Sequence, residues 1–165
     1  MSEATLAAWL PELILMEDYN GNWSEFFDIV YQTFCEDFVD DKPCFRGQRL
    51  GLKRYPEYDG KSATFWHMIS DGKVEVDREP DLRRCERIGW PRPSIENETS
   101  DEIKIWSEKN GGDRRILLWN EAASYLVVLN KRKGYILPWT AYTVEYNNQK
   151  RKLKRRWERN KDNEI

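Results

Sequence analysis

The chain contains a single histidine, His67, within the segment Thr64-Phe-Trp-His-Met-Ile69. Imidazole titrates near neutral pH without special tuning, so His67 is the first side chain to consider as a general acid or base. A structural interpretation stays open beside it, in which the ring caps the apolar core next to Phe65 and Trp66. Because the chain has no second histidine, a mechanism that uses two imidazoles is excluded.

Cationic side chains gather in three segments, 46–54, 83–87 and 150–161, with aromatic residues between them. Residues 1–41 contain ten acidic side chains and neither Lys nor Arg, so the rest of the chain carries 27 basic groups against 19 acidic ones. A surface that presents such cations together attracts a polyphosphate, and Trp or Tyr rings beside it can stack on bases. Nucleic acid is therefore the natural candidate ligand.

Each basic segment also has a structural interpretation. Arg46 and Lys53 fit solvated positions on a strand. The arginines at 83, 84 and 87 fit an ion-pair cluster with Asp81 and Glu86 as well as they fit a phosphate site. The helix expected at 150–161 would carry its cations on a solvated face. Residue type alone does not decide between these interpretations.

Length and composition favour one folded domain. The 165 residues are enough for an ordinary core, and eight Trp among 13% aromatics require burial. No run of about 18 apolar residues occurs and the first residues do not resemble a secretory signal, so we expect a cytoplasmic protein without a membrane segment. The three cysteines lack metal-ligand spacing, and we expect reduced thiols, no metal and no cofactor.

The acidic residues 1–43 are predicted to form the helical N-terminal part of the same domain. Asn22 is a typical helix cap, and apolar side chains recur on one helical face from Trp23 to Phe38. This part either closes one side of the sheet, which we favour, or lies over the basic residues and competes with RNA.

Residues 44–160 are predicted to form the main body of the domain, followed by a short tail at 161–165. We expect a basic strand at 44–54, a helix at 61–69, a loop at 70–80, a helical turn at 81–88 and strand structure from Ser94. Three β-rich runs follow at 115–119, 125–129 and 135–144, and Pro138 indicates an edge strand or a bulge. Asn147 or Asn148 should cap a basic helix with an apolar seam at Leu153 and Trp157. The fold class is thus α+β, with an antiparallel sheet of four or five strands, N-terminal helices and a basic C-terminal helix.

This order of elements resembles the ribonuclease superfamily that includes barnase, EndoU, colicin and RelE-like proteins. The segment Tyr135-Ile-Leu-Pro-Trp139-Thr140-Ala-Tyr142-Thr-Val144, followed by Lys150-Arg151-Lys-Leu, is similar to the last strand and helix of its phage-associated branch. The resemblance covers residues 44–158.

The resemblance implies a metal-independent endoribonuclease, toxin-like or phage-associated, in which a ribose 2'-hydroxyl attacks the adjacent phosphorus and leaves a 2',3'-cyclic phosphate. Such a reaction needs a base, an acid and cations that stabilise the phosphorane. The candidate catalytic residues are His67, Lys53, Arg84, Thr140 and Tyr142. The candidate substrate-binding residues are Arg46, Arg83, Arg87, Trp139, Lys150 and Arg151.

The resemblance further implies that the partner is RNA and that an antitoxin or immunity protein neutralises the enzyme by covering its basic face. The alternative is a non-catalytic module that binds nucleic acid or a protein through the same face. Composition does not separate the two, because binding and cleaving a phosphate require the same cations. The RNA target and the oligomeric state stay open.

Overall fold

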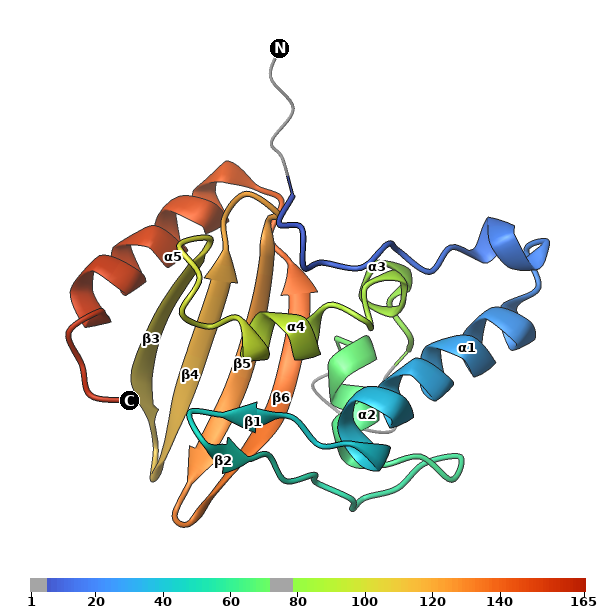
Figure 1. Ribbon diagram of the computed structural model, residues 1–165, viewed down its shortest axis with the longest axis horizontal. Helices are drawn as coiled ribbons and strands as arrows, with labels where there is room; N and C mark the ends of the chain where they lie inside the picture. The colour runs from blue at the N-terminus through green and yellow to red at the C-terminus, as the bar shows by residue number, and fades with distance from the viewer. Residues whose placement is uncertain (1–5, 72–78) are drawn as a thin grey trace.

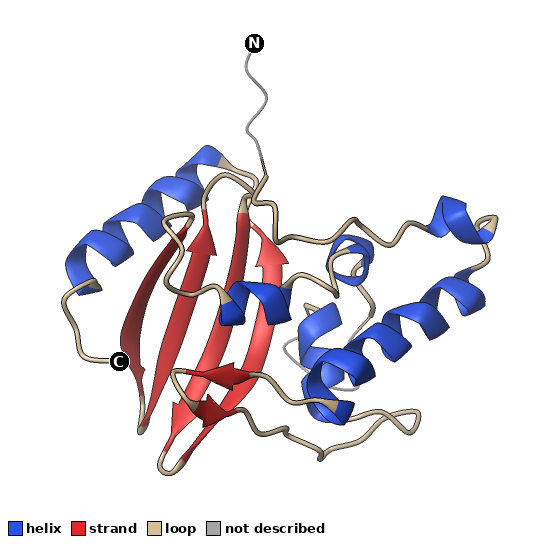
Figure 2. Cartoon of the chain, in the orientation of Figure 1, coloured by secondary structure: helices blue, strands red, loops and turns tan. Residues whose placement is uncertain are grey.

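The computed structural model describes residues 6–71 and 79–165. Its centre is a four-stranded antiparallel sheet whose strands follow one another in chain order, joined by short turns (Figures 1 and 2). The strands are β3 (Ile103–Asn110), β4 (Asp113–Asn120), β5 (Tyr125–Arg132) and β6 (Tyr135–Thr143). The predicted antiparallel sheet is confirmed, with four strands in the order of a meander, and with it the α+β class.

Helices and a small hairpin surround this sheet. Helices α1, α2 and α3 lie beside the edge strand β6, α4 and the β1–β2 hairpin cross one face, and α5 packs on the other (Figure 1). Their bounds are η1 (Met16–Tyr19), α1 (Trp23–Cys35), η2 (Glu36–Asp40), β1 (Cys44–Phe45), β2 (Gln48–Arg49), α2 (Ala63–Ile69), α3 (Leu82–Glu86), α4 (Pro91–Glu96) and α5 (Asn147–Asn160).

Helix α1 begins where the sequence predicts. The Asn22 side chain accepts a hydrogen bond from the Glu25 backbone N–H at 3.1 Å, which satisfies one of the free donors of the first turn. Phe26, Val30 and Phe34 are buried, so the predicted apolar face is confirmed as core.

The two faces of the sheet bury different clusters, because side chains alternate along each strand. One face packs Ile116, Leu118 and Val127 against the aromatic face of α1 and against α2. The other face packs fully buried Trp106 and Trp119 against Leu153 of α5. The acidic N-terminal helices thus belong to the first face, as favoured from the sequence, and share one core with the sheet.

The prediction of one continuous strand at 44–54 is wrong. The chain forms the two-residue strands β1 and β2, which pair as a hairpin separate from the main sheet. Arg46 and Gly47 both have positive φ, 50° and 80°, the backbone of a tight hairpin turn whose twist matches its strands. Residues after Arg49 then run as a loop toward α2.

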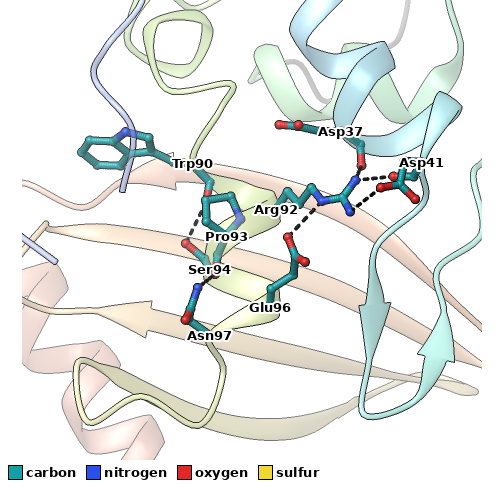
Figure 3. Close-up of polar contacts among 8 residues, drawn as sticks. All are labelled: Asp37, Asp41, Trp90, Arg92, Pro93, Ser94, Glu96 and Asn97. Carbon is teal, nitrogen blue, oxygen red and sulfur yellow. Dashed lines mark hydrogen bonds and ion pairs between the residues drawn. The ribbon is translucent and has the colours of Figure 1, made fainter. Parts of the chain in front are cut away.

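The expectation of strand structure from Ser94 is also wrong. Pro91 occupies the first position of α4, where its missing N–H costs nothing and its fixed φ favours the helix. Ser94 Oγ donates to the Trp90 carbonyl at 2.9 Å inside this helix, and the strand begins only at Ile103 (Figure 3). The predicted helical turn at 81–88 is confirmed as α3.

Helix α4 is fastened to the N-terminal part by Arg92 (Figure 3). The guanidinium donates to the Asp37 carbonyl at 2.9 Å, to the Asp41 carbonyl, and to the Asp41 carboxylate at 3.0 Å. It also donates to Glu96 at 2.9 Å, one turn further along α4. One largely buried side chain therefore joins η2, the turn before β1 and α4.

The C-terminal helix has the predicted seam but another cap. Leu153 is buried and Trp157 packs against the same cluster, whereas the capping position is Tyr146, whose side chain makes no capping bond. The tail beyond α5 passes the edge strand β3, where the Ser107 hydroxyl donates to the Glu164 carbonyl at 2.9 Å. Most of the loop predicted at 70–80 lies outside the described residues; Ser70 and Pro80 pair across its ends.

Candidate functional site

A cleft of about 660 Å³ lies between α2, α3, the second half of β6 and the first half of α5. We call it the α2–β6 cleft. Its α2 and α3 side is lined by His67, Ser70, Asp71, Asp81 and Arg84. Strand β6 contributes Trp139, Thr140, Tyr142 and Thr143, and α5 contributes Gln149, Lys152, Leu153 and Arg156. Segments about 70 residues apart in the sequence therefore meet there.

A bulge in β6 places two consecutive side chains in this cleft. Val128 pairs with Thr140 and Leu129 with Pro138, so Trp139 is the extra residue. Pro138, which has no N–H for the ladder, sits at this irregularity in the edge strand β6. The prediction for Pro138 is confirmed, and the bulge explains why both Trp139 and Thr140 line the cleft.

His67 occupies the half-buried face of α2 that turns toward β6. Its ring centroid lies 5.1 Å from that of Trp139, with the ring planes tilted by 42°. Its backbone carbonyl accepts a hydrogen bond from the Thr140 hydroxyl at 3.1 Å. The buried neighbours Phe65 and Trp66 hold α2 against α1, which fixes the position of His67.

Arg84 forms the α3 wall of the cleft, with a side chain only 10% exposed. Its Nη1 donates to the Ser70 carbonyl at 2.9 Å and to the Thr140 hydroxyl at 3.2 Å. Its guanidinium lies 5.0 Å from the centre of the Tyr142 ring, and the Asp71 carboxylate lies 3.7 Å from its Nη2. A cation is thus held in a fixed orientation beside Tyr142.

Tyr142 carries the phenol of the cleft. Burial raises the pKa of Tyr142, while the nearby guanidinium groups of Arg156 and Arg84 act in the opposite direction. The phenol consequently keeps its proton at neutral pH and is available as a hydrogen-bond or proton donor.

Three cations lie within about 6 Å of the centre of the Trp139 ring. Arg115 lies 4.3 Å, Arg132 5.7 Å and Lys53 5.8 Å from its ring centre. We call Lys53, Arg115 and Arg132 the Trp139 cations. Burial lowers the pKa of the Arg115 guanidinium, and the charge of Arg132 adds to this, against the effect of Asp113. A basic surface therefore adjoins the cleft on the same face of the sheet.

The structure thus brings together most of the sequence-predicted catalytic residues. His67, Arg84, Thr140 and Tyr142 line one cleft, and Lys53 lies beside it through Trp139. Arg115 and Arg132 were missed. Alternation along β4 and β5 puts Arg115 and Arg132 on the same face of the sheet as Trp119. Sequence alone does not show which face of the sheet carries the cleft, so this pattern did not identify them.

Most of the predicted substrate-binding residues lie elsewhere. Arg46 pairs with Glu98 at 3.2 Å in the β1–β2 turn, and Arg83 pairs with Glu145. Arg87 lies 3.6 Å from Glu86 and stacks on Trp90.

The basic helix α5 meets the cleft through other positions than expected. Gln149, Lys152 and Arg156 line it, whereas Lys150 and Arg151 do not. Among the predicted substrate-binding residues, Trp139 alone lines the cleft.

Within residues 6–71 and 79–165 no group of three His, Cys, Asp or Glu side chains is placed to hold a metal ion. In the same ranges no helix is both long and apolar enough to cross a membrane. The fold and cleft define an α+β protein with a basic site at the edge of its sheet. No family model, curated protein or solved structure matches the chain.

Proposed function

We propose that this protein is a metal-independent endoribonuclease, a toxin-like or phage-associated effector that acts on RNA in the cytoplasm. One observation carries the proposal: the α2–β6 cleft assembles His67, Arg84, Thr140 and Tyr142 from three separate elements. A candidate base, a phenolic donor and an oriented cation lining one cleft are the groups that RNA cleavage requires.

In the proposed reaction His67 accepts the proton of a ribose 2'-hydroxyl, whose oxygen forms a bond to the adjacent phosphorus. The bond from phosphorus to the 5'-oxygen breaks, and Tyr142, which is protonated at neutral pH, supplies the proton to that oxygen. Arg84 and Lys53 stabilise the additional negative charge of the phosphorane. The products are a 2',3'-cyclic phosphate and a 5'-hydroxyl.

The bases of the substrate would stack near Trp139, whose ring is close both to His67 and to the Trp139 cations. A ribonuclease that remains in the cell that produces it must be inhibited there. An antitoxin or immunity protein covering the cleft is the partner we propose from the resemblance.

A second candidate is a binding module that uses the same face without catalysis. The hydrogen bonds of the cleft favour this candidate, because Arg84 donates to the Ser70 carbonyl and Thr140 donates to the His67 carbonyl. Such bonds join α2, α3 and β6, which is a structural role. Binding to RNA then depends on the cations alone.

The test is incubation of the purified protein with total RNA in excess EDTA, followed by analysis of product ends. We expect 2',3'-cyclic phosphates, and a loss of about 100-fold or more in rate for His67→Gln and for Tyr142→Phe. Tyr55→Phe is the matched control, since Tyr55 is 65% exposed and outside the cleft.

The two candidates give different results in this assay. Absence of cleavage together with salt-sensitive RNA binding would replace the enzyme by the binding module. Cleavage that disappears in EDTA would contradict metal independence, and cleavage unchanged in both cleft variants would contradict the assigned residues.

A further inference from the structure

A second groove, of about 750 Å³, adjoins the α2–β6 cleft along α5. It runs between α5 and the turn that joins β3 to β4, and we call it the α5 groove. Six cations line it: Lys109, Arg114, Lys152, Arg155, Arg156 and Arg159. Lys152 and Arg156 line both this groove and the cleft, so the two form neighbouring parts of one surface.

The negative charge in the α5 groove is already compensated. Glu108 lines it and accepts two hydrogen bonds from Arg156, both at 2.8 Å, and one from the Trp106 indole at 2.7 Å. The Arg156 hydrogen bonds lower the pKa of Glu108 despite the opposing effect of burial, so this carboxylate is ionised at neutral pH and paired. The other cations of the groove retain an excess of positive charge.

The arrangement of these cations costs stability in the absence of an anion. On α5, Arg155 and Arg159 are four residues apart, and like charges at this spacing repel. Across the β3–β4 pair, Lys109 lies directly opposite Arg114, another unfavourable pairing of like charges. A bound polyanion would relieve both repulsions, which favours a phosphate backbone as the ligand.

We propose that the α5 groove binds the backbone of single-stranded RNA that extends beyond the cleft. This inference rests on the proposed function, because the strand is the one whose scissile phosphate occupies the α2–β6 cleft. Lys152 and Arg156 line both the cleft and the α5 groove, so the strand would contact them where it runs from one to the other. Helix α5 contributes positive charge and no stacking surface to this groove, so we expect binding there to depend on salt and little on sequence.

The test is the affinity of fluorescein-labelled 2'-O-methyl oligouridylates of about 4 and about 12 nucleotides, measured by anisotropy across a salt series. The methyl group removes the attacking hydroxyl, so binding is measured whether or not the protein cleaves RNA. The groove variant is Arg155→Gln/Arg159→Gln. The matched control is Arg49→Gln/Lys154→Gln, which removes the same charge from exposed positions outside both grooves.

We expect the groove variant to bind the longer oligonucleotide about tenfold more weakly near physiological salt, with a salt slope lower by about 1.4. The short oligonucleotide and the control variant should show little change. Equal losses in the groove and control variants would overturn the proposal, since they would report net charge alone.

A negatively charged protein segment is the competing ligand. If the groove variant binds the long oligonucleotide like the wild type but loses affinity for polyglutamate, the RNA assignment is wrong. Failure of the proposed function has a different signature: no cleavage of natural RNA, with the length-dependent effect of the groove variant retained.

Discussion

Thr140 shows how a single hydroxyl can hold the cleft together. It donates to the His67 carbonyl of α2 at 3.1 Å and accepts from Arg84 of α3 at 3.2 Å, while its own backbone belongs to β6. Both roles of the hydroxyl are thus filled by neighbouring elements. By propensity Thr140 is an ordinary strand residue, so its importance follows from its partners and not from its type.

Asp37 is a residue whose charge opposes folding. It is half-buried on η2, and burial raises its pKa from 3.8 to about 6, although Arg92 acts in the opposite direction. The folded state therefore holds this proton more tightly than the unfolded chain. Between pH 3.8 and about 6 the stability contributed by Asp37 falls as pH rises, and above that range the full penalty of a buried carboxylate applies.

We predict that Asp37→Asn stabilises the protein near pH 7.5 by about 1.5 kcal/mol, a value halved to allow for partial solvent exposure, and much less near pH 4. The Asp37 carbonyl that accepts from Arg92 is unchanged in this variant. Urea unfolding at the two pH values measures the difference. An equal gain at both would show that the carboxylate charge is not the cause.

At the scale of elements, local signals predicted most of the regular structure. Asn22 as a cap with an apolar face behind it gave α1, and alternating β-branched and aromatic runs gave β4, β5 and β6. The β1–β2 hairpin was not predicted, because its turn residues are Arg46 and Gly47, and arginine rarely adopts positive φ. Helix α4 was not predicted, because proline usually ends a helix; Pro91 and Pro93 instead lie in its first turn, where Pro91 costs no hydrogen bond.

Several residues of the cleft could be predicted from the sequence, but their arrangement could not. Residue type pointed to His67 and Arg84, and the resemblance pointed to Thr140 and Tyr142. Their proximity depends on α2 lying along β6, a long-range contact without a local signal. On α5 the cationic residues are so dense that pattern alone did not show which of them face the cleft. The packing of Leu153 against the sheet decides this and places Lys152 and Arg156 along the cleft.

The attachment of α4 to the N-terminal part yields a prediction for Arg92. Its side chain is 18% exposed and makes hydrogen bonds to Asp37, Asp41 and Glu96 (Figure 3). Arg92→Ala removes these bonds and leaves carbonyls without their donor, so we expect a loss of about 2 to 3 kcal/mol in the free energy of unfolding.

Urea denaturation of Arg92→Ala beside Arg49→Ala measures this loss. Arg49 is exposed on the short strand β2, and its replacement should change stability by less than about 0.5 kcal/mol. Similar values for the two variants would mean that α4 is held by its apolar contacts alone.

At the scale of the whole molecule, charge is divided between two sides. The acidic residues from Glu12 to Asp41 belong to the part that packs on the face with Ile116 and Leu118, beside β6. The cleft and the α5 groove are both lined by α5, which packs on the other face through the cluster that contains Leu153. Opposite charges on two sides would orient an approaching RNA toward the basic side.

This division argues against the N-terminal part as a brake on RNA binding. We predict that Glu25→Gln/Asp28→Asn, which removes two exposed charges from α1, changes RNA affinity less than twofold at physiological salt, where screening acts over about 8 Å. Asp71→Asn should instead strengthen binding about threefold, because Asp71 lines the cleft and lies 3.7 Å from Arg84. Anisotropy with a 2'-O-methyl oligouridylate measures both. A larger gain from the α1 variant than from Asp71→Asn would contradict this prediction. It would show that the acidic N-terminal part competes with RNA for the basic surface.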